Sequence, residues 1–118
     1  MGGGSNEIGF RYDRLTDGGN WQCITRLSST ETKTNSGVAV TASSTGANMQ
    51  TLEFVVNEAA TEVLFYIDGV LVATHTTNIP QARVGYGVEM EALTAFATQE
   101  PIIGIDWLRF EMTRSTPR

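Results

Sequence analysis

The sequence predicts an all-β protein, an antiparallel β-sandwich, and three observations support that fold class. Most segments alternate apolar with polar residues, and their apolar positions are rich in β-branched and aromatic side chains. Gly, Asn, Asp, Ser and Thr separate these segments, as expected of turns. Asp68 and Gly69 lie between two apolar runs and suit a type I′ hairpin turn, which needs positive φ at both residues. No segment predicts a helix.

The first half of the chain is expected to contribute three strands. Ile8, Phe10 and Tyr12 alternate with small or polar residues, which favours a strand, and a Gly-rich turn at 16–20 leads into a second strand from Trp21 to about Leu27. A polar stretch rich in Ser and Thr follows at 28–36, and no strand is assigned to it. A short strand is then expected at 37–41, before a loop of small residues at 43–48.

The second half contains the stronger strand patterns. Alternation at 49–56 predicts a strand, residues 57–60 a turn, and residues 62–74 the hairpin around Asp68 and Gly69. Pro80 interrupts the ladder because proline has no backbone N–H to donate. Further strands are expected at 83–92 and 101–112. The eight or nine strands, joined mostly by short turns, predict an antiparallel meander.

Length and cysteine content predict a single domain without disulfides. Of the 118 residues, 41% are hydrophobic, which is enough for one modest core. We expect the single β-sandwich domain to span residues 6–113. Residues 1–5 resemble a flexible linker or cloning remnant, and residues 114–118 are expected to form a C-terminal tail. Cys23 is the only cysteine, so an intramolecular disulfide is excluded, and a small buried thiol in a strand is expected.

The charge balance argues against nucleic acid as a partner. Thirteen acidic residues oppose eight basic ones, for a net charge of −5, and no basic patch is evident. The apolar runs are too short for the roughly 20 residues that a membrane-spanning helix needs, so membrane insertion is not expected. No signal peptide is predicted at the start of the sequence.

Four segments of the chain resemble a known superfamily. Residues 52–56, 63–74, 79–80 and 105–111 are similar, in order and spacing, to the C-terminal half of the concanavalin A-like lectin/glucanase jelly roll, which includes laminin-G-like modules and β-glucanases. The resemblance implies a jelly roll, shortened because family domains are usually longer. It also implies a sugar-facing or surface-facing role, as in phage tail-fibre, virion and adhesin modules, and hence an extracellular or virion-surface location.

The residues do not predict an enzyme. Retaining glycosidases place two carboxylates about 5 to 5.5 Å apart across the scissile bond. The Glu-x-Asp-x-x-Glu strand that supplies them in the family's glucanases is absent, which leaves a glycoside-hydrolase remnant as a lesser alternative. Glu89 and Glu91 lie two apart on one predicted strand face. They are expected to be solvated, with a carboxylate site for catalysis or for a cation such as calcium as the alternative; no other cofactor is expected. His75 is expected to be exposed on an edge strand.

Aromatic residues are the main candidates for ligand binding, because a flat ring matches the apolar C–H face of a sugar. For each of them, burial in the core or an interface is the competing interpretation. Tyr12 and Tyr66 are candidates, with Arg11 as a neighbouring polar group. The predicted ligand-binding set combines aromatic and charged side chains: Trp21, Tyr86, Glu89, Glu91, Trp107 and Arg109.

Two classes of function therefore remain open. The first is a non-catalytic module that binds a glycan or cell-surface polysaccharide as part of a virion or surface fibre. The second is a structural domain, such as capsid decoration or fibre, that assembles with copies of itself, with a trimer as the expected oligomer. Strand 63–67 favours assembly, because its alternate side chains are apolar on both faces and predict cover on both.

Overall fold

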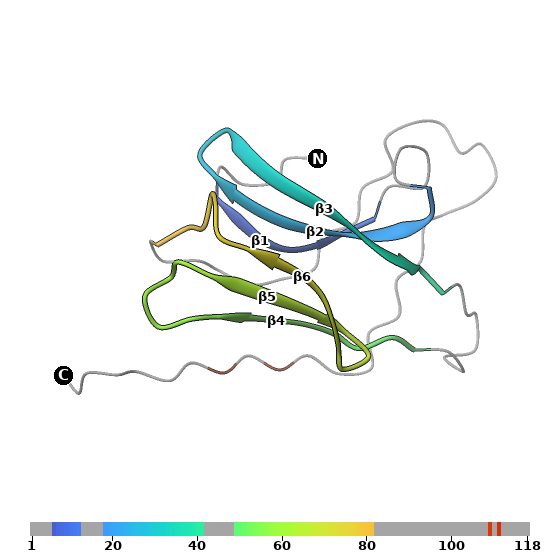
Figure 1. Cartoon of the computed structure of the whole chain (residues 1–118). Coiled ribbons are helices and arrows are strands. Elements are labelled where there is room, and N and C mark those ends of the chain that lie inside the picture. Colours follow the sequence, from blue (N-terminus) through green and yellow to red (C-terminus); the bar gives the residue numbers. More distant parts are fainter. Residues whose placement is uncertain (1–5, 13–17, 42–48, 82–108, 110, 112–118) are drawn as a thin grey trace. The chain divides into compact units, whose positions relative to one another are not determined.

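The described part of the chain contains two antiparallel three-stranded sheets and no helix, which confirms the all-β sandwich class. The computed structural model describes residues 6–12, 18–41, 49–81, 109 and 111. We call the sheets A (order β1-β2-β3) and B (order β4-β5-β6); Figure 1 labels their strands. Within these residues, no helix has the length and apolarity needed to cross a membrane.

Sheet A consists of β1 (Glu7–Arg11), β2 (Asn20–Leu27) and β3 (Thr30–Ala39). The strand expected at 21–27 is confirmed, whereas no strand was predicted at 28–36, and most of this stretch belongs to β3. Its threonines are β-branched and fit a pleated surface, with Thr32 and Thr34 half-buried beside β2. Ser28, at φ 55°, turns the chain between the two strands.

Sheet B consists of β4 (Leu52–Val56), β5 (Val63–Ile67) and β6 (Val70–His75). The hairpin turn is confirmed, since Asp68 and Gly69 have φ of 50° and 79°. The Asp68 carboxylate also accepts a hydrogen bond from the Thr51 backbone N–H at 2.8 Å, so this turn is tied to the start of β4.

The core lies where the inner faces of the two sheets meet. Phe65 of β5 is fully buried, and its ring lies 5.4 Å from that of Phe10 on β1, centroid to centroid. Cys23 is buried in the same cluster, as the sequence predicted, and burial raises the pKa of its thiol to about 11. The expectation that both faces of β5 are covered is only partly right: the inner side chains are buried, whereas Leu64 and Tyr66 on the outer face are half-buried.

All six strands lie in one compact unit, Gly2–Val84, whereas Arg109 and Glu111 belong to a second unit that begins at Gly85. The strands expected at 83–92 and 101–112 lie outside the residues that the structure describes, apart from these two. The single-domain boundary at 6–113 stays a prediction.

Candidate functional site

An aromatic pair lies at one end of sheet A, where β1 finishes and β2 starts. Arg11 pairs with Gln22 in the β1–β2 register, so the next residue, Tyr12, comes beside Trp21. The two rings are 6.2 Å apart between centroids and tilted by 60°, and Phe10 also contacts Trp21, edge-on with 6.4 Å between the centroids. Trp21 is half-buried, whereas Tyr12 is 42% exposed. One ring of the pair is therefore available to a ligand.

Gln50 fixes the indole of Trp21. Its Oε1 accepts hydrogen bonds from Trp21 Nε1 at 2.9 Å and from the Thr41 backbone N–H at 3.0 Å, and its Nε2 donates to the Ala39 carbonyl at 3.0 Å. The amide thus joins β2, the end of β3 and the approach to β4. We call Tyr12, Trp21 and Gln50 the aromatic end.

Gln50 was not predicted as a site residue from the sequence. Trp21 and Gln50 are 29 residues apart, and an isolated polar residue before an alternating strand carries no local pattern that would single it out. The clue was indirect: a half-buried tryptophan needs an acceptor for its N–H.

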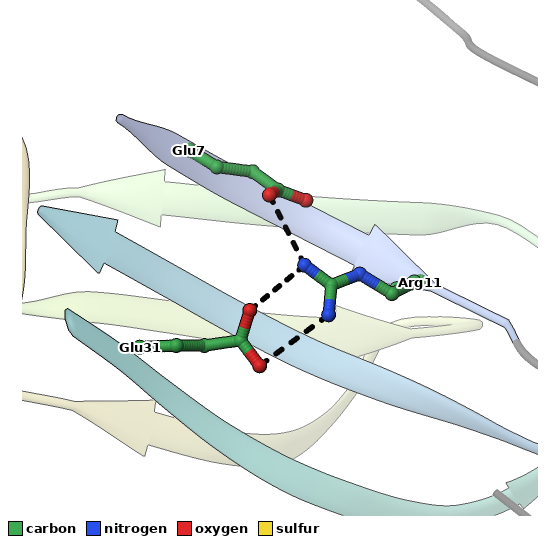
Figure 2. A network of polar contacts seen from close by, with 3 residues as sticks. All are labelled: Glu7, Arg11 and Glu31. Atoms are coloured by element: carbon green, nitrogen blue, oxygen red, sulfur yellow. Dashed lines mark hydrogen bonds and ion pairs between the residues drawn. The ribbon is translucent and has the colours of Figure 1, made fainter. Parts of the chain in front are cut away.

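Arg11 was a candidate ligand contact, but two carboxylates already engage it, as Figure 2 shows. Its guanidinium donates to Glu31 at 2.8 and 3.3 Å and to Glu7 at 3.1 Å, so the network spans β2 from β1 to β3. Burial acts to lower the pKa of Arg11, but the hydrogen bond to Glu31 and the charges of both acids outweigh it and raise that pKa. This arginine has a structural task.

The Arg11 network also accounts for an apolar residue on the outer face of sheet A. Ile24 is fully buried, although the register places it on the same face as Arg11 and Glu31. The Arg11–Glu31 ion pair connects the two strands on either side of β2 on this face, and the apolar stem of an arginine can shield a neighbouring side chain from water. The outer face of sheet A is closed partly by its own side chains.

Among the other predicted site residues, Tyr66 is not brought to the aromatic end. Tyr66 lies on the outer face of sheet B, opposite Leu71 of β6. By the alternation of β2, Trp21 lies on the inner face of sheet A. Arg109 is exposed and pairs with Glu111, two residues further along the chain. The other four lie outside the described residues: Tyr86, Glu89, Glu91 and Trp107.

The expectation of an exposed His75 is wrong. The side chain is 2% exposed, because the β5–β6 register places His75 opposite the buried Val63. Its ring nitrogens lie 2.9 Å from Thr25 Oγ1 and 2.9 Å from Thr34 Oγ1. Burial lowers the pKa of His75.

The described residues contain no group of three or more His, Cys, Asp or Glu side chains placed to hold a metal ion. At the aromatic end they offer a fixed indole and an exposed phenol, an arrangement suited to binding the apolar face of a flat ligand.

Comparison with known proteins gives one match. The family model described as SO2946-like, C-terminal domain, matches residues 2–106. No curated protein and no solved structure shows significant similarity to the chain. Because the match spans most of the sequence, the chain belongs to the SO2946-like C-terminal domain family.

Proposed function

We propose that this protein is a non-catalytic carbohydrate-recognition module of a virion or surface fibre, with a shortened concanavalin A-like jelly roll, working outside the cell. The observation that supports binding is the pairing of the exposed Tyr12 ring with a Trp21 indole held by Gln50. A ring fixed before the ligand arrives loses little conformational entropy on binding.

The size of the aromatic end sets the expected affinity. Contacts of an aromatic ring contribute about 1 kcal/mol each beyond their buried area, so one small site is expected to bind a sugar weakly, with a Kd near 1 mM. Copies linked in one oligomer would raise the apparent affinity by about 10² to 10⁴ when the glycan presents repeated epitopes. Weak single sites therefore fit a multivalent fibre.

A glycan array followed by calorimetric titration tests the binding proposal. Tyr12→Ala is expected to weaken binding of the best array ligand about tenfold while leaving the fold intact, because Tyr12 is 42% exposed and is not one of the buried core residues. Leu27→Ala is the matched control, since Leu27 is 43% exposed, lies at the opposite end of β2 from Trp21 and should not alter glycan binding. A blank array with the intact oligomer, or equal binding by the Tyr12→Ala variant, would contradict the proposal.

A second candidate, self-assembly, is supported by the outer face of sheet B. This face carries apolar side chains from all three strands, with Val55 and Leu71 both exposed and Leu64 and Tyr66 half-buried between them. A large exposed apolar patch is typical of an interaction surface. We name these four residues the apolar face.

Charge favours a contact between unlike surfaces of two copies. Residues 49–81 include four acids and no Lys or Arg, so all eight basic residues lie elsewhere in the chain. A contact between the acidic sheet B of one copy and a base-bearing region of the next is heterologous, and such contacts close into rings, a trimer among them, or continue as filaments.

Sedimentation at several concentrations tests assembly. Leu71→Glu is expected to dissociate the oligomer by placing a charge in the interface, whereas Leu27→Glu, at a site of similar exposure on sheet A, is the control. High salt should also weaken the association if charge helps to choose the partner surface. A wild-type monomer at micromolar concentration would contradict this candidate.

A further inference from the structure

A buried polar network ties the end of β6 to sheet A. His75, the last residue of β6, contacts Thr25 on β2 through Nδ1 and Thr34 on β3 through Nε2. Thr25 Oγ1 also donates to the Thr77 carbonyl at 2.9 Å. Two residues further on, Asn78 Nδ2 donates to Thr32 Oγ1 at 2.9 Å. Residues 75–78 are thus held to β2 and β3 by hydroxyl groups.

The hydrogen bonds assign the proton of the imidazole. A carbonyl can only accept, so the single hydroxyl proton of Thr25 goes to Thr77, and Thr25 Oγ1 must accept from His75 Nδ1–H. A neutral ring has only one N–H, which leaves Nε2 to accept from the Thr34 hydroxyl. The network therefore fits the neutral Nδ1–H tautomer, with both nitrogens satisfied.

Protonation disturbs this arrangement. The new Nε2–H needs an acceptor, so the Thr34 hydroxyl would have to turn its own proton elsewhere. The positive charge would also form beside the Phe65 ring, whose centroid lies 4.9 Å from that of the imidazole. Burying a charge without a partner is costly.

Among the described residues of the unit that contains His75, no carboxylate faces its ring to offset the charge. From β2 the titratable neighbour on the inner face is Cys23, whose pKa of about 11 keeps it neutral at physiological pH. From β3, Glu31 and Lys33 alternate with the threonines and so lie on the outer face. On β5, Val63 and Phe65 are apolar, and Glu62, just before that strand, is next to Val63 and by alternation is directed away from it.

We propose that His75 is a pH-sensitive latch between the two sheets: the neutral ring holds residues 75–78 against β2 and β3, and protonation in mildly acid solution releases them. Ile79 and Pro80 follow directly and are buried, so release exposes part of the core. This device is independent of the glycan and assembly proposals.

The direction of the pH effect follows from burial. The pKa of His75 is lowered in the folded chain, so the open or unfolded chain binds the extra proton more readily. The latch is fully effective above the ordinary histidine pKa of about 6.5, and its contribution is lost as pH falls from there towards the folded pKa. Within that window the equilibrium constant for opening is expected to rise by up to about tenfold per pH unit.

Two measurements on the full chain test the latch. His75 is the only histidine, so its ring protons can be followed by NMR between pH 8 and pH 5 without ambiguity. We expect a pKa below 6.5, together with faster amide exchange of residues 75–78 at pH 5.5 than at pH 7.5 after correction for intrinsic rates. The central strand of sheet B, β5, should keep its protection in the same experiment.

The variant His75→Gln separates a titrating latch from a merely structural histidine. Glutamine can donate and accept but does not titrate in this range, so the pH dependence of unfolding between 7.5 and 5.5 should disappear. The same pH dependence in His75→Gln and wild type would overturn the proposal. If this variant does not fold, a wild-type ring pKa at or above 6.5, or unchanged exchange at residues 75–78, would overturn it instead.

Discussion

The aromatic end and the apolar face differ in how firmly their side chains are held. At the aromatic end, Trp21 is fixed by Gln50 and packed against Phe10, and only Tyr12 is largely exposed. On the apolar face, Val55 and Leu71 are exposed and apolar, and Glu53 is the nearest charged neighbour on β4. A preorganised ring suits a small rigid ligand, whereas loosely specified apolar area suits burial against a protein surface. The two surfaces fit two different tasks.

Phe65 is the residue on which both surfaces depend, and its loss should have the largest effect. Phe65→Ala removes a fully buried ring that contacts Phe10 and Phe54, and should lower the free energy of unfolding by about 3 to 5 kcal/mol. Urea unfolding measures this loss. A loss below about 1 kcal/mol would mean that the two sheets do not share one core.

Gln50→Ala should impair the aromatic end and leave the apolar face unchanged. It leaves the Trp21 indole N–H, the Thr41 N–H and the Ala39 carbonyl without their shared partner, at an expected cost of about 2 kcal/mol. Gln50→Glu keeps the acceptor and loses only the donor, so its cost should be smaller. Glycan affinity should fall in the Ala variant while the sedimentation behaviour stays the same. Equal stability of all three proteins would show that the amide does not fix the indole.

Arg11→Met tests whether the Arg11 network shields side chains on the outer face of sheet A from solvent, in contrast to the exposed side chains on the outer face of sheet B. The substitution keeps an apolar stem over β2 but leaves Glu7 and Glu31 without their cation, and about 1 kcal/mol of stability should be lost, since the site is partly exposed. Glu31→Gln should cost more than Glu7→Gln, because Glu31 accepts two of the three hydrogen bonds. The reverse order would contradict the assigned network.

Changes on the apolar face should have the smallest effect on stability. Val55→Thr keeps a β-branched shape at an exposed position, so the free energy of unfolding should change by less than about 0.5 kcal/mol. Self-association should nevertheless weaken, which sedimentation would detect. A large loss of stability in a monomer would show that this face is already packed within one chain.

The fold class could be predicted from the sequence because the patterns that indicate it are local. Alternation and the Asp68-Gly69 pair are short-range features, and both were confirmed in sheet B. The polar strand β3 was missed because its side chains are mostly Thr, Ser and Asn, which also occur in loops; only pairing with β2 reveals a strand. Likewise, half-covered β5 looks the same in sequence as a strand buried on both faces.

The candidate site was less predictable because its partners are distant in sequence. Trp21 was predicted as a binding residue, but its hydrogen-bond partner Gln50 was not. Arg11 was also a candidate, and its guanidinium is bound by acidic side chains of the same sheet. His75 lies in a polar Thr-rich segment that resembles an exposed strand end. Its burial depends on Thr25 and Thr34, which are 50 and 41 residues away. No local period predicts such a network.

One NMR titration tests most directly whether the aromatic end, and not the apolar face, binds the glycan. The array ligand would be added to the full chain while the Trp21 indole N–H and the methyl groups of Val55 and Leu71 are observed together. We expect saturable shifts of the indole signal and none of the methyl signals. Methyl shifts without a change in the Trp21 indole would contradict it, because the ligand would then occupy the apolar face.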